Sequence, residues 1–334
     1  MKTKNIFLVV GFLSVVLVSV LAAAESTPRP LQRFEKWLTP ISDAMNSSDD
    51  EKEVSDELIS SGGREMSFNL QALGRLYEGQ DKDFRELRFA FKEFEDGIGE
   101  YNKWVEVRKA AKQSGASPAD IKKIEKRVLD ARKDLAEMLT TGNWVPNAKD
   151  SRLNGIVDFL DSYDWGTDEE DRDVVLTTLE SQLKAVQDTE YDFSALEKGD
   201  GLHEARREIR WFLIGARVLD GLVIYDKKNP TCPVPDLEGL VNEPIATDKY
   251  AGLPASKSEK NPCVISQCLF LSLVDAVNKL GEIKDQAEKE NNATGTTVSD
   301  KVPTALRKKA ESVWQGLEDN GVLGSLRKEI KSCH

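Results

Sequence analysis

Leu202-His203-Glu204-Ala205-Arg206-Arg207-Glu208-Ile209-Arg210-Trp211-Phe212-Leu213-Ile214-Gly215-Ala216-Arg217-Val218-Leu219 is the stretch from which the fold is most readily predicted. At about 100° per residue, one face of such a helix is apolar: Leu202, Ala205, Ile209, Phe212, Leu213, Ala216 and Leu219. On a neighbouring face, Arg206, Arg210 and Arg217 fall within about 60° of His203. Glu204 and Glu208 point elsewhere, so the helix supplies no i,i+4 partners for these four residues, the second cationic stripe. The pattern indicates an amphipathic helix that packs into a core and offers its cations to external anions.

The same pattern occurs earlier, in Phe84–Tyr101, at a constant offset of 118 residues (203 − 85). Arg85, Arg88 and Lys92, the first cationic stripe, take the places of His203, Arg206 and Arg210, and no gap is needed. Two copies of one helical unit would explain this agreement, and internal repeats are a frequent origin of such self-similarity. The alternative is chance, because amphipathic helices agree in part through their periodicity alone.

His-x-x-Arg-x-x-x-Arg at the start of an amphipathic helix, present twice in a helical chain, resembles the CHAD family, the conserved histidine α-helical domain. The resemblance covers these two helices, and Arg85 stands where the motif of the family has histidine. It implies two helical-bundle repeats whose basic helices line a shared groove. Family members are associated with inorganic polyphosphate, so the resemblance implies the same ligand for this groove.

The amino terminus has the pattern of a secretory signal. Lys2 and Lys4 precede an apolar run, and Ala22-Ala23-Ala24 is typical of a cleavage site. We therefore expect residues 1–24 to be removed and the protein to be periplasmic or secreted after cleavage near Ala24. No later stretch is apolar enough for a membrane span. Asn46 and Asn292 begin glycosylation sequons, which matter only in a eukaryotic secretory pathway.

The net charge is −12 for the whole chain and −14 without Lys2 and Lys4. This acidity makes general binding to nucleic acid or to anionic membranes unfavourable. A local basic groove is still compatible with it, because exposed charges more than about 10 Å apart are largely screened. The expected partner is inorganic polyphosphate or another phosphate-bearing polyanion.

All four cysteines lie in the last third of the chain: Cys232, Cys263, Cys268 and Cys333. In an exported chain they indicate disulfides, and their spacing is poor for zinc. We expect Cys232 to pair with Cys263, closing the proline-rich segment 229–263, and Cys268 to pair with Cys333. The alternative pairing joins Cys232 to Cys268 and Cys263 to Cys333.

Motifs for catalysis are absent from the sequence. There are only two histidines, His203 and His334, and no phosphate loop, dinucleotide fingerprint or metalloprotease motif occurs. The seven acids in Asp161–Asp173 lack the spacing of a calcium loop, and an acidic helix start explains them more simply. We therefore expect no enzyme activity, no cofactor and no metal. A phosphate-ester hydrolase, the third hypothesis, would need metal-binding carboxylates.

The predicted fold class is all-α, because helical periodicity recurs and almost no stretch alternates with period two. We expect two related helical-bundle repeats around a shared basic groove, at 25–190 and 191–334, with the Pro/Cys-rich loop inserted in the second. Ser117-Pro118 marks the start of a long helix that ends near Gly142. The leading functional hypothesis is non-catalytic polyanion binding. The alternative is a structural or adhesion-type helical scaffold, in which Arg206 and Arg210 would form internal ion pairs.

Overall fold

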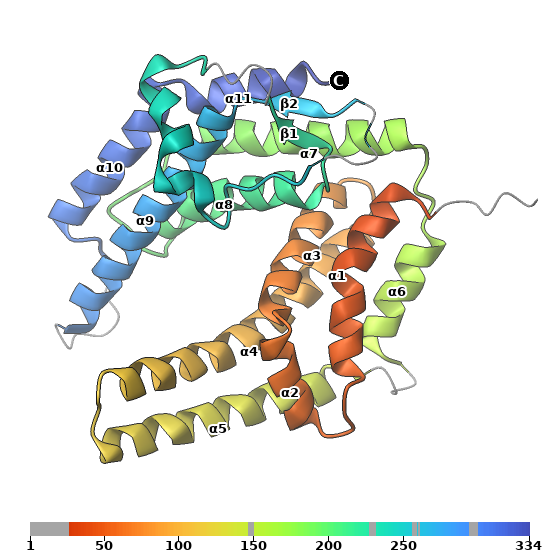
Figure 1. Cartoon of the computed structure of the whole chain (residues 1–334), viewed down its shortest axis with the longest axis vertical. Coiled ribbons are helices and arrows are strands. Elements are labelled where there is room, and N and C mark those ends of the chain that lie inside the picture. Colours follow the sequence, from red (N-terminus) through yellow and green to blue (C-terminus); the bar gives the residue numbers. More distant parts are fainter. Residues whose placement is uncertain (1–26, 146–149, 227–231, 256–258, 260, 294–299) are drawn as a thin grey trace, which may run out of the picture.

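The computed structural model describes residues 27–145, 150–226, 232–255, 259, 261–293 and 300–334. The predicted signal sequence, residues 1–24, lies outside the described residues. The described chain is mostly helical (Figure 1), which confirms the all-α fold class. Among the described helices, none combines the length and the apolar character that a membrane span requires.

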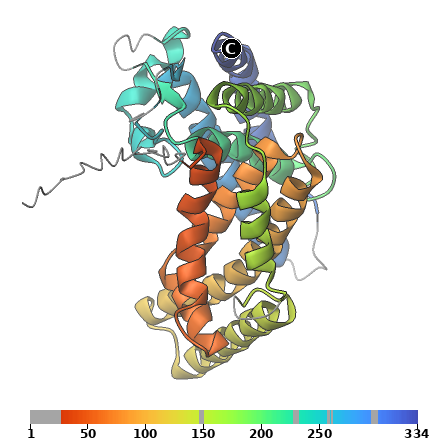
Figure 2. The same ribbon diagram turned by 90° about the vertical axis from the view of Figure 1, so that its right-hand side faces the viewer.

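The helices form two groups (Figure 1). The first group contains α1 (Arg29–Met45), α2 (Glu51–Ser60), α3 (Gly63–Tyr77), α4 (Lys82–Gln113), α5 (Pro118–Thr141) and α6 (Arg152–Ser162). The second group contains α7 (Asp168–Asp188), α8 (Leu202–Val218), α9 (Gln267–Ala293), α10 (Thr304–Asp319) and α11 (Val322–Lys331). Figure 2 shows α1, α3 and α6 side by side beneath α7, and Figure 1 shows the antiparallel α4–α5 hairpin projecting from the first group.

Two helix starts follow from their capping residues, of which the one at Ser117 was predicted. The Ser117 side chain accepts a hydrogen bond from the backbone N–H of Asp120, and Pro118 occupies the first turn of α5. At the start of α7, Thr167 and Glu170 form a reciprocal capping box. The first turn of α7 is acidic and lies at the positive end of the helix dipole, which explains the cluster of acids before it.

Helix α3 lies at the centre of the fold and packs against α1, α4, α7 and α8. Its Leu70 and Leu73 are fully buried in the core. Gly74 permits the close approach of α4, because a Cβ atom there would lie 3.0 Å from both the Phe84 carbonyl oxygen and the Arg88 Cβ atom. Helix α3 therefore lies between α4 and α8, which carry the first and second cationic stripes.

Helix α7 belongs to the first repeat in the predicted division at residue 190. In space it packs mainly against α8 and α11 of the second group, with a smaller contact to α3. The boundary between the two spatial groups therefore lies before α7 in the sequence, and not after it. The repeat division itself stays a prediction.

A buried polar triad ties the two groups together. Arg33 of α1 donates to Asp171 of α7 at 2.8 Å and to the Tyr77 hydroxyl of α3 at 2.9 Å, and the Tyr77 hydroxyl donates to Asp171. All three residues are at most 6 % exposed. Burial raises the pKa of Tyr77 well above its usual value, so this hydroxyl stays protonated and remains a donor.

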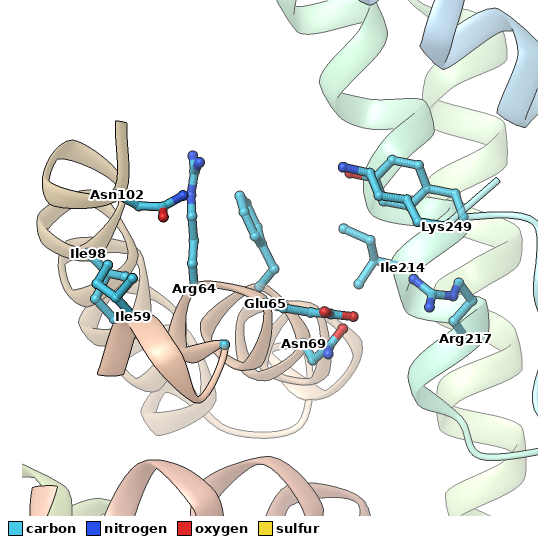
Figure 3. A pocket seen from close by; sticks show the side chains of 12 residues that line it. Ile59, Arg64, Glu65, Asn69, Ile98, Asn102, Ile214, Arg217 and Lys249 are labelled. Carbon is cyan, nitrogen blue, oxygen red and sulfur yellow. The ribbon is translucent and has the colours of Figure 1, made fainter. Parts of the chain in front are cut away.

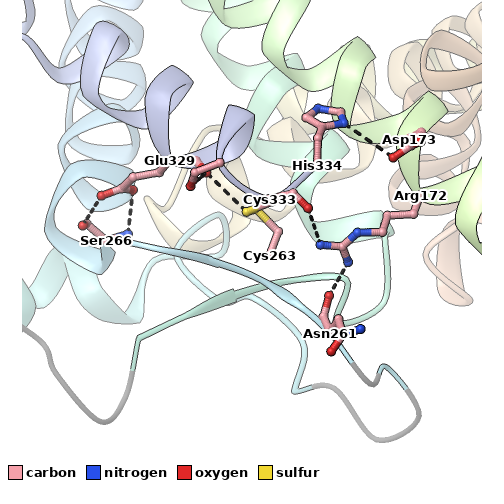
Figure 4. Close-up of a disulfide and its surroundings, with 9 residues drawn as sticks. Arg172, Asp173, Asn261, Cys263, Ser266, Glu329, Cys333 and His334 are labelled. Carbon is pink, nitrogen blue, oxygen red and sulfur yellow. Dashed lines mark hydrogen bonds and ion pairs between the residues drawn. A yellow bond between two sulfur atoms is a disulfide. The ribbon is translucent and has the colours of Figure 1, made fainter.

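Two disulfides are present, but the favoured pairing is wrong. The structure joins Cys232 to Cys268 and Cys263 to Cys333, and no free cysteine remains in the described residues. The reason is a small parallel sheet that the periodicity did not predict: β1 (Val223–Tyr225) pairs with β2 (Cys263–Ile265). This pairing holds Cys263 at the end of α11 next to Cys333 (Figure 4), whereas Cys268, in the first turn of α9, lies near Cys232.

The proline-rich segment forms no α-helix in its described residues, as predicted, and contains only two short 3₁₀ helices, η1 (Pro235–Asn242) and η2 (Pro244–Thr247). Its middle is fixed by two hydrogen bonds. Asn278 of α9 donates to Asp248 at 3.0 Å, and the Tyr225 hydroxyl of β1 donates to the carbonyl oxygen of Ala251. The segment is therefore held both by the Cys232–Cys268 disulfide near its start and by hydrogen bonds in its middle.

Candidate functional site

Arg206 of the second cationic stripe lies in the interface between α8 and α9. Its Nε atom donates to the Val277 carbonyl oxygen at 3.1 Å. The guanidinium lies against Gly281, where an added Cβ atom would be only 2.9 Å from Nε and 3.2 Å from Cζ. Glycine at this position thus makes room for a flat guanidinium and fixes its orientation.

Arg210 lies one turn further along α8, against aromatic rings. Its Cζ atom is 5.1 Å from the ring centroid of Phe68 in α3 and 5.8 Å from that of Trp211. Its Nε atom is buried without a hydrogen-bond partner, and burial lowers the pKa of the guanidinium from its usual value. Cation–π contacts of this kind orient Arg and offset part of its lost hydration.

Neither Arg206 nor Arg210 forms an ion pair with any carboxylate in the described residues. The acids of α8 are engaged elsewhere, as the helical positions predict. Glu204 pairs with Arg207 at 2.6 Å, and Glu208 lies 3.6 Å from Arg75 of α3. Two adjacent guanidinium groups on α8 are therefore left without a carboxylate in ion-pair contact among the described residues.

His203 has a different character from the two arginines after it. Its Nδ1 atom lies 3.5 Å from Glu197, and its side chain is 28 % exposed. Burial is the largest influence and lowers the pKa of the imidazole below its usual 6.5, although Glu197 acts in the opposite direction. At neutral pH His203 is therefore mostly uncharged, and it adds hydrogen-bonding capacity rather than charge to the stripe.

The first cationic stripe is largely neutralised by its own neighbours. Arg88 lies 2.9 Å from Glu78, and Lys92 pairs with Asp96 one turn away. Arg85 is exposed, and its guanidinium lies 5.6 Å from the ring centroid of Phe89. The two stripes thus differ in their availability to an anion, and a single groove shared by both stays a prediction.

Arg217 ends the second cationic stripe and lies apart from Arg206 and Arg210. Its Nε atom donates to the Gly252 carbonyl oxygen of the proline-rich segment at 3.2 Å. It lines a cleft between α3, α8 and this segment (Figure 3). The arginines of the second cationic stripe therefore lie in two places. Arg206 and Arg210 lie together, and Arg217 lies apart from them in the cleft.

Sequence reasoning missed the cations of α3, which lie between the two stripes. Arg64 pairs with Glu95 of α4 at 2.8 Å, and its guanidinium lies 5.6 Å from the ring centroid of Phe68. Arg75 lies 4.7 Å from the ring centroid of Trp211. The sequence did contain a pattern that could have predicted them, because Arg64, Phe68 and Arg75 share one face of a helix at i, i+4 and i+11. The rings of Phe68 and Trp211 lie 5.9 Å apart, so these contacts join α3 to α8.

No group of three or more histidine, cysteine, aspartate or glutamate side chains in the described residues is arranged to hold a metal ion. Comparison of the chain with protein-family models, with curated proteins and with solved structures finds no match.

Proposed function

We propose that this protein binds inorganic polyphosphate, or another phosphate-rich polyanion, through Arg206 and Arg210 and catalyses no reaction on it. The observation that carries the proposal is the absence of a carboxylate partner for either guanidinium in the described residues. Both groups are nevertheless oriented, Arg206 by Gly281 and Arg210 by Phe68. Oriented cations without a carboxylate partner in the described residues are suited to an external anion.

Arginine is the appropriate residue for this ligand. Its guanidinium stays charged at all physiological pH values and donates two parallel hydrogen bonds to phosphate oxygens. Arg206 also repels the nearby Arg210 and contributes to the lowered pKa of the Arg210 guanidinium. A bound phosphate chain would remove this repulsion. We therefore expect the ligand to stabilise the folded protein as well as to bind it.

A structural scaffold is the second candidate, and the first cationic stripe favours it. Arg88 and Lys92 pair with neighbouring acids and give a polyanion little free charge. A scaffold has no need of unpaired arginines on α8, however, and would be expected to neutralise them. The two candidates therefore make opposite predictions for the replacement of these arginines.

The deciding experiment measures retention of the protein on immobilised polyphosphate at low salt. The double variant Arg206→Ala, Arg210→Ala should bind at least tenfold more weakly than wild type, since charge-assisted hydrogen bonds contribute about 1.5–3 kcal/mol each. Arg307→Ala is the matched control, because this exposed arginine of α10 pairs with Glu311 of its own helix, away from Arg206 and Arg210 in the sequence. Equal retention of the double variant and wild type would refute the assignment of the site.

A further inference from the structure

A second site lies where α2, α3, α4, α8 and the segment after η2 meet (Figure 3). The cleft has a volume of about 330 Å³, at the lower end of the range for small-molecule sites and equal to the share of about eleven water molecules. Much of its wall is apolar and is formed by Ile59, Ile98, Ile214 and Phe68. A cleft of this size and lining suits a small ligand with an apolar body.

Asn69 gives this cleft a polar contact that the fold leaves unused. The residue is only 5 % exposed and lines the cleft, yet its amide forms no hydrogen bond within the described part of the chain. Figure 3 shows Asn69 and Glu65 extending from α3 toward Arg217 of α8. The amide atoms are not sealed off from solvent, so they can bond to a ligand in the cleft or to a water that holds its place.

The charged side chains that line the cleft favour a ligand with a single negative charge. Arg217 donates only its Nε atom to a backbone carbonyl, and Lys249 lies 4.9 Å from the ring centroid of Tyr250. No ion pair joins either cation to Glu65, the acid at the exposed edge of the cleft, within the described residues. Two positive charges and one negative charge leave a net charge of +1. Arg64, the remaining cation, is already neutralised by Glu95.

The proline-rich segment has a role in this arrangement. It supplies Lys249 and Tyr250 as one wall of the cleft, opposite α3. The Cys232–Cys268 disulfide and the hydrogen bond from Asn278 to Asp248 hold that wall in place without any ligand. A wall fixed in advance lowers the entropy cost of binding.

We propose that this cleft binds a small organic acid, with a single carboxylate held by Arg217, Lys249 and Asn69 and with an apolar body against Ile214, Ile98 and Phe68. This inference goes beyond polyanion binding and does not depend on it. The polyanion site uses Arg206 and Arg210, neither of which lines the cleft. The two sites share Phe68, which orients Arg210 and forms part of the cleft wall, so each site is tested through charged residues that the other does not use.

The test uses decanoate as the probe, below its micelle concentration, in isothermal titration calorimetry of the full chain. We expect saturable binding of one decanoate per chain. Decyltrimethylammonium, which has the same apolar tail and the opposite charge, should not bind. Equal binding of the two probes, or no saturable binding of decanoate, would overturn the proposal. Binding of decyl phosphate without decanoate would overturn the carboxylate assignment.

Lys249→Glu is the decisive variant, because this exposed side chain is not needed for folding. It should weaken decanoate binding at least tenfold, as expected when a charge-assisted contact is lost and a like charge is introduced. Lys309→Glu, at an exposed position of α10, is the matched control and should bind as wild type does. The Arg206→Ala, Arg210→Ala variant should retain decanoate, which separates failure of this proposal from failure of the polyanion site. Unchanged affinity in Lys249→Glu would place the ligand elsewhere.

Discussion

Replacement of Asp171 by alanine should destabilise the protein more than any surface substitution. Asp171 is the only carboxylate that pairs with Arg33 in the described residues, and the two side chains are 3 % and 6 % exposed. Its removal leaves a guanidinium buried with only the Tyr77 hydroxyl as a partner. Breaking a buried ion pair in this way costs about 3–5 kcal/mol, a large part of the roughly 5–15 kcal/mol that stabilises a typical domain.

Urea unfolding, followed by the far-ultraviolet circular dichroism of the helices, measures this loss. The midpoint should fall while the dependence of unfolding free energy on urea stays unchanged. Glu93→Ala is the matched control, because Glu93 pairs with Arg152 at the same 2.8 Å but the side chains are 51 % and 35 % exposed. An exposed pair contributes at most about 1 kcal/mol.

The double variant Arg33→Met, Asp171→Leu distinguishes two contributions to the lost stability: the cost of a buried charge without a partner, and the loss of the ion pair itself. Hydrophobic replacement of both partners should recover much of the stability that Asp171→Ala loses, because neither charge is then buried. The reasoning would be refuted if Asp171→Ala cost no more than Glu93→Ala. Such a result would mean that Arg33 finds another partner or reaches solvent when Asp171 is removed.

Three further predictions follow from the second group of helices. Gly281→Ala should displace the Arg206 guanidinium, whose Nε atom would lie 2.9 Å from the new Cβ atom, and polyphosphate retention should fall with little loss of helix content. Because burial lowers the pKa of His203, its contribution to stability should be fully present above about pH 6.5 and should decline as the pH falls through the lowered folded-state pKa. Urea unfolding between pH 8 and 5 should therefore show a weaker decline for His203→Gln than for wild type. An equal decline in the two proteins would count against this role of His203. Replacing Cys263 and Cys333 together with serine should cost about 4 kcal/mol, since their disulfide closes a 70-residue separation, and peptide mapping of the unreduced protein should recover this pair.

Local signals were sufficient to predict most helices. The cap at Ser117, the acidic first turn of α7 and the apolar face of α8 each depend on residues within one or two turns. The absence of partners for Arg206 and Arg210 on their own helix was also predictable, because the positions of Glu204 and Glu208 exclude them, whereas partners from other helices stayed open. Short-range geometry is fixed by the helix itself, so sequence spacing translates directly into position.

The features that sequence reasoning missed depend on contacts between distant segments. Three-residue strands are too short for a periodicity signal, so the pairing that fixes Cys263, and with it the disulfide connectivity, was not predictable. The contact of Arg64 with Phe68 was within reach of helical spacing, but its position next to α8 was not. The cleft at Asn69 required five segments to be placed in space at once.

The central claim is that Arg206 and Arg210 bind phosphate, and the salt dependence of polyphosphate affinity tests it most directly. Each phosphate contact releases condensed counterions, so affinity should fall linearly on a log–log plot against salt concentration. We predict measurable binding by wild type at low salt and a shallower slope, with weaker affinity, for Arg206→Ala, Arg210→Ala. Wild-type protein that does not bind polyphosphate even at low salt would contradict the account.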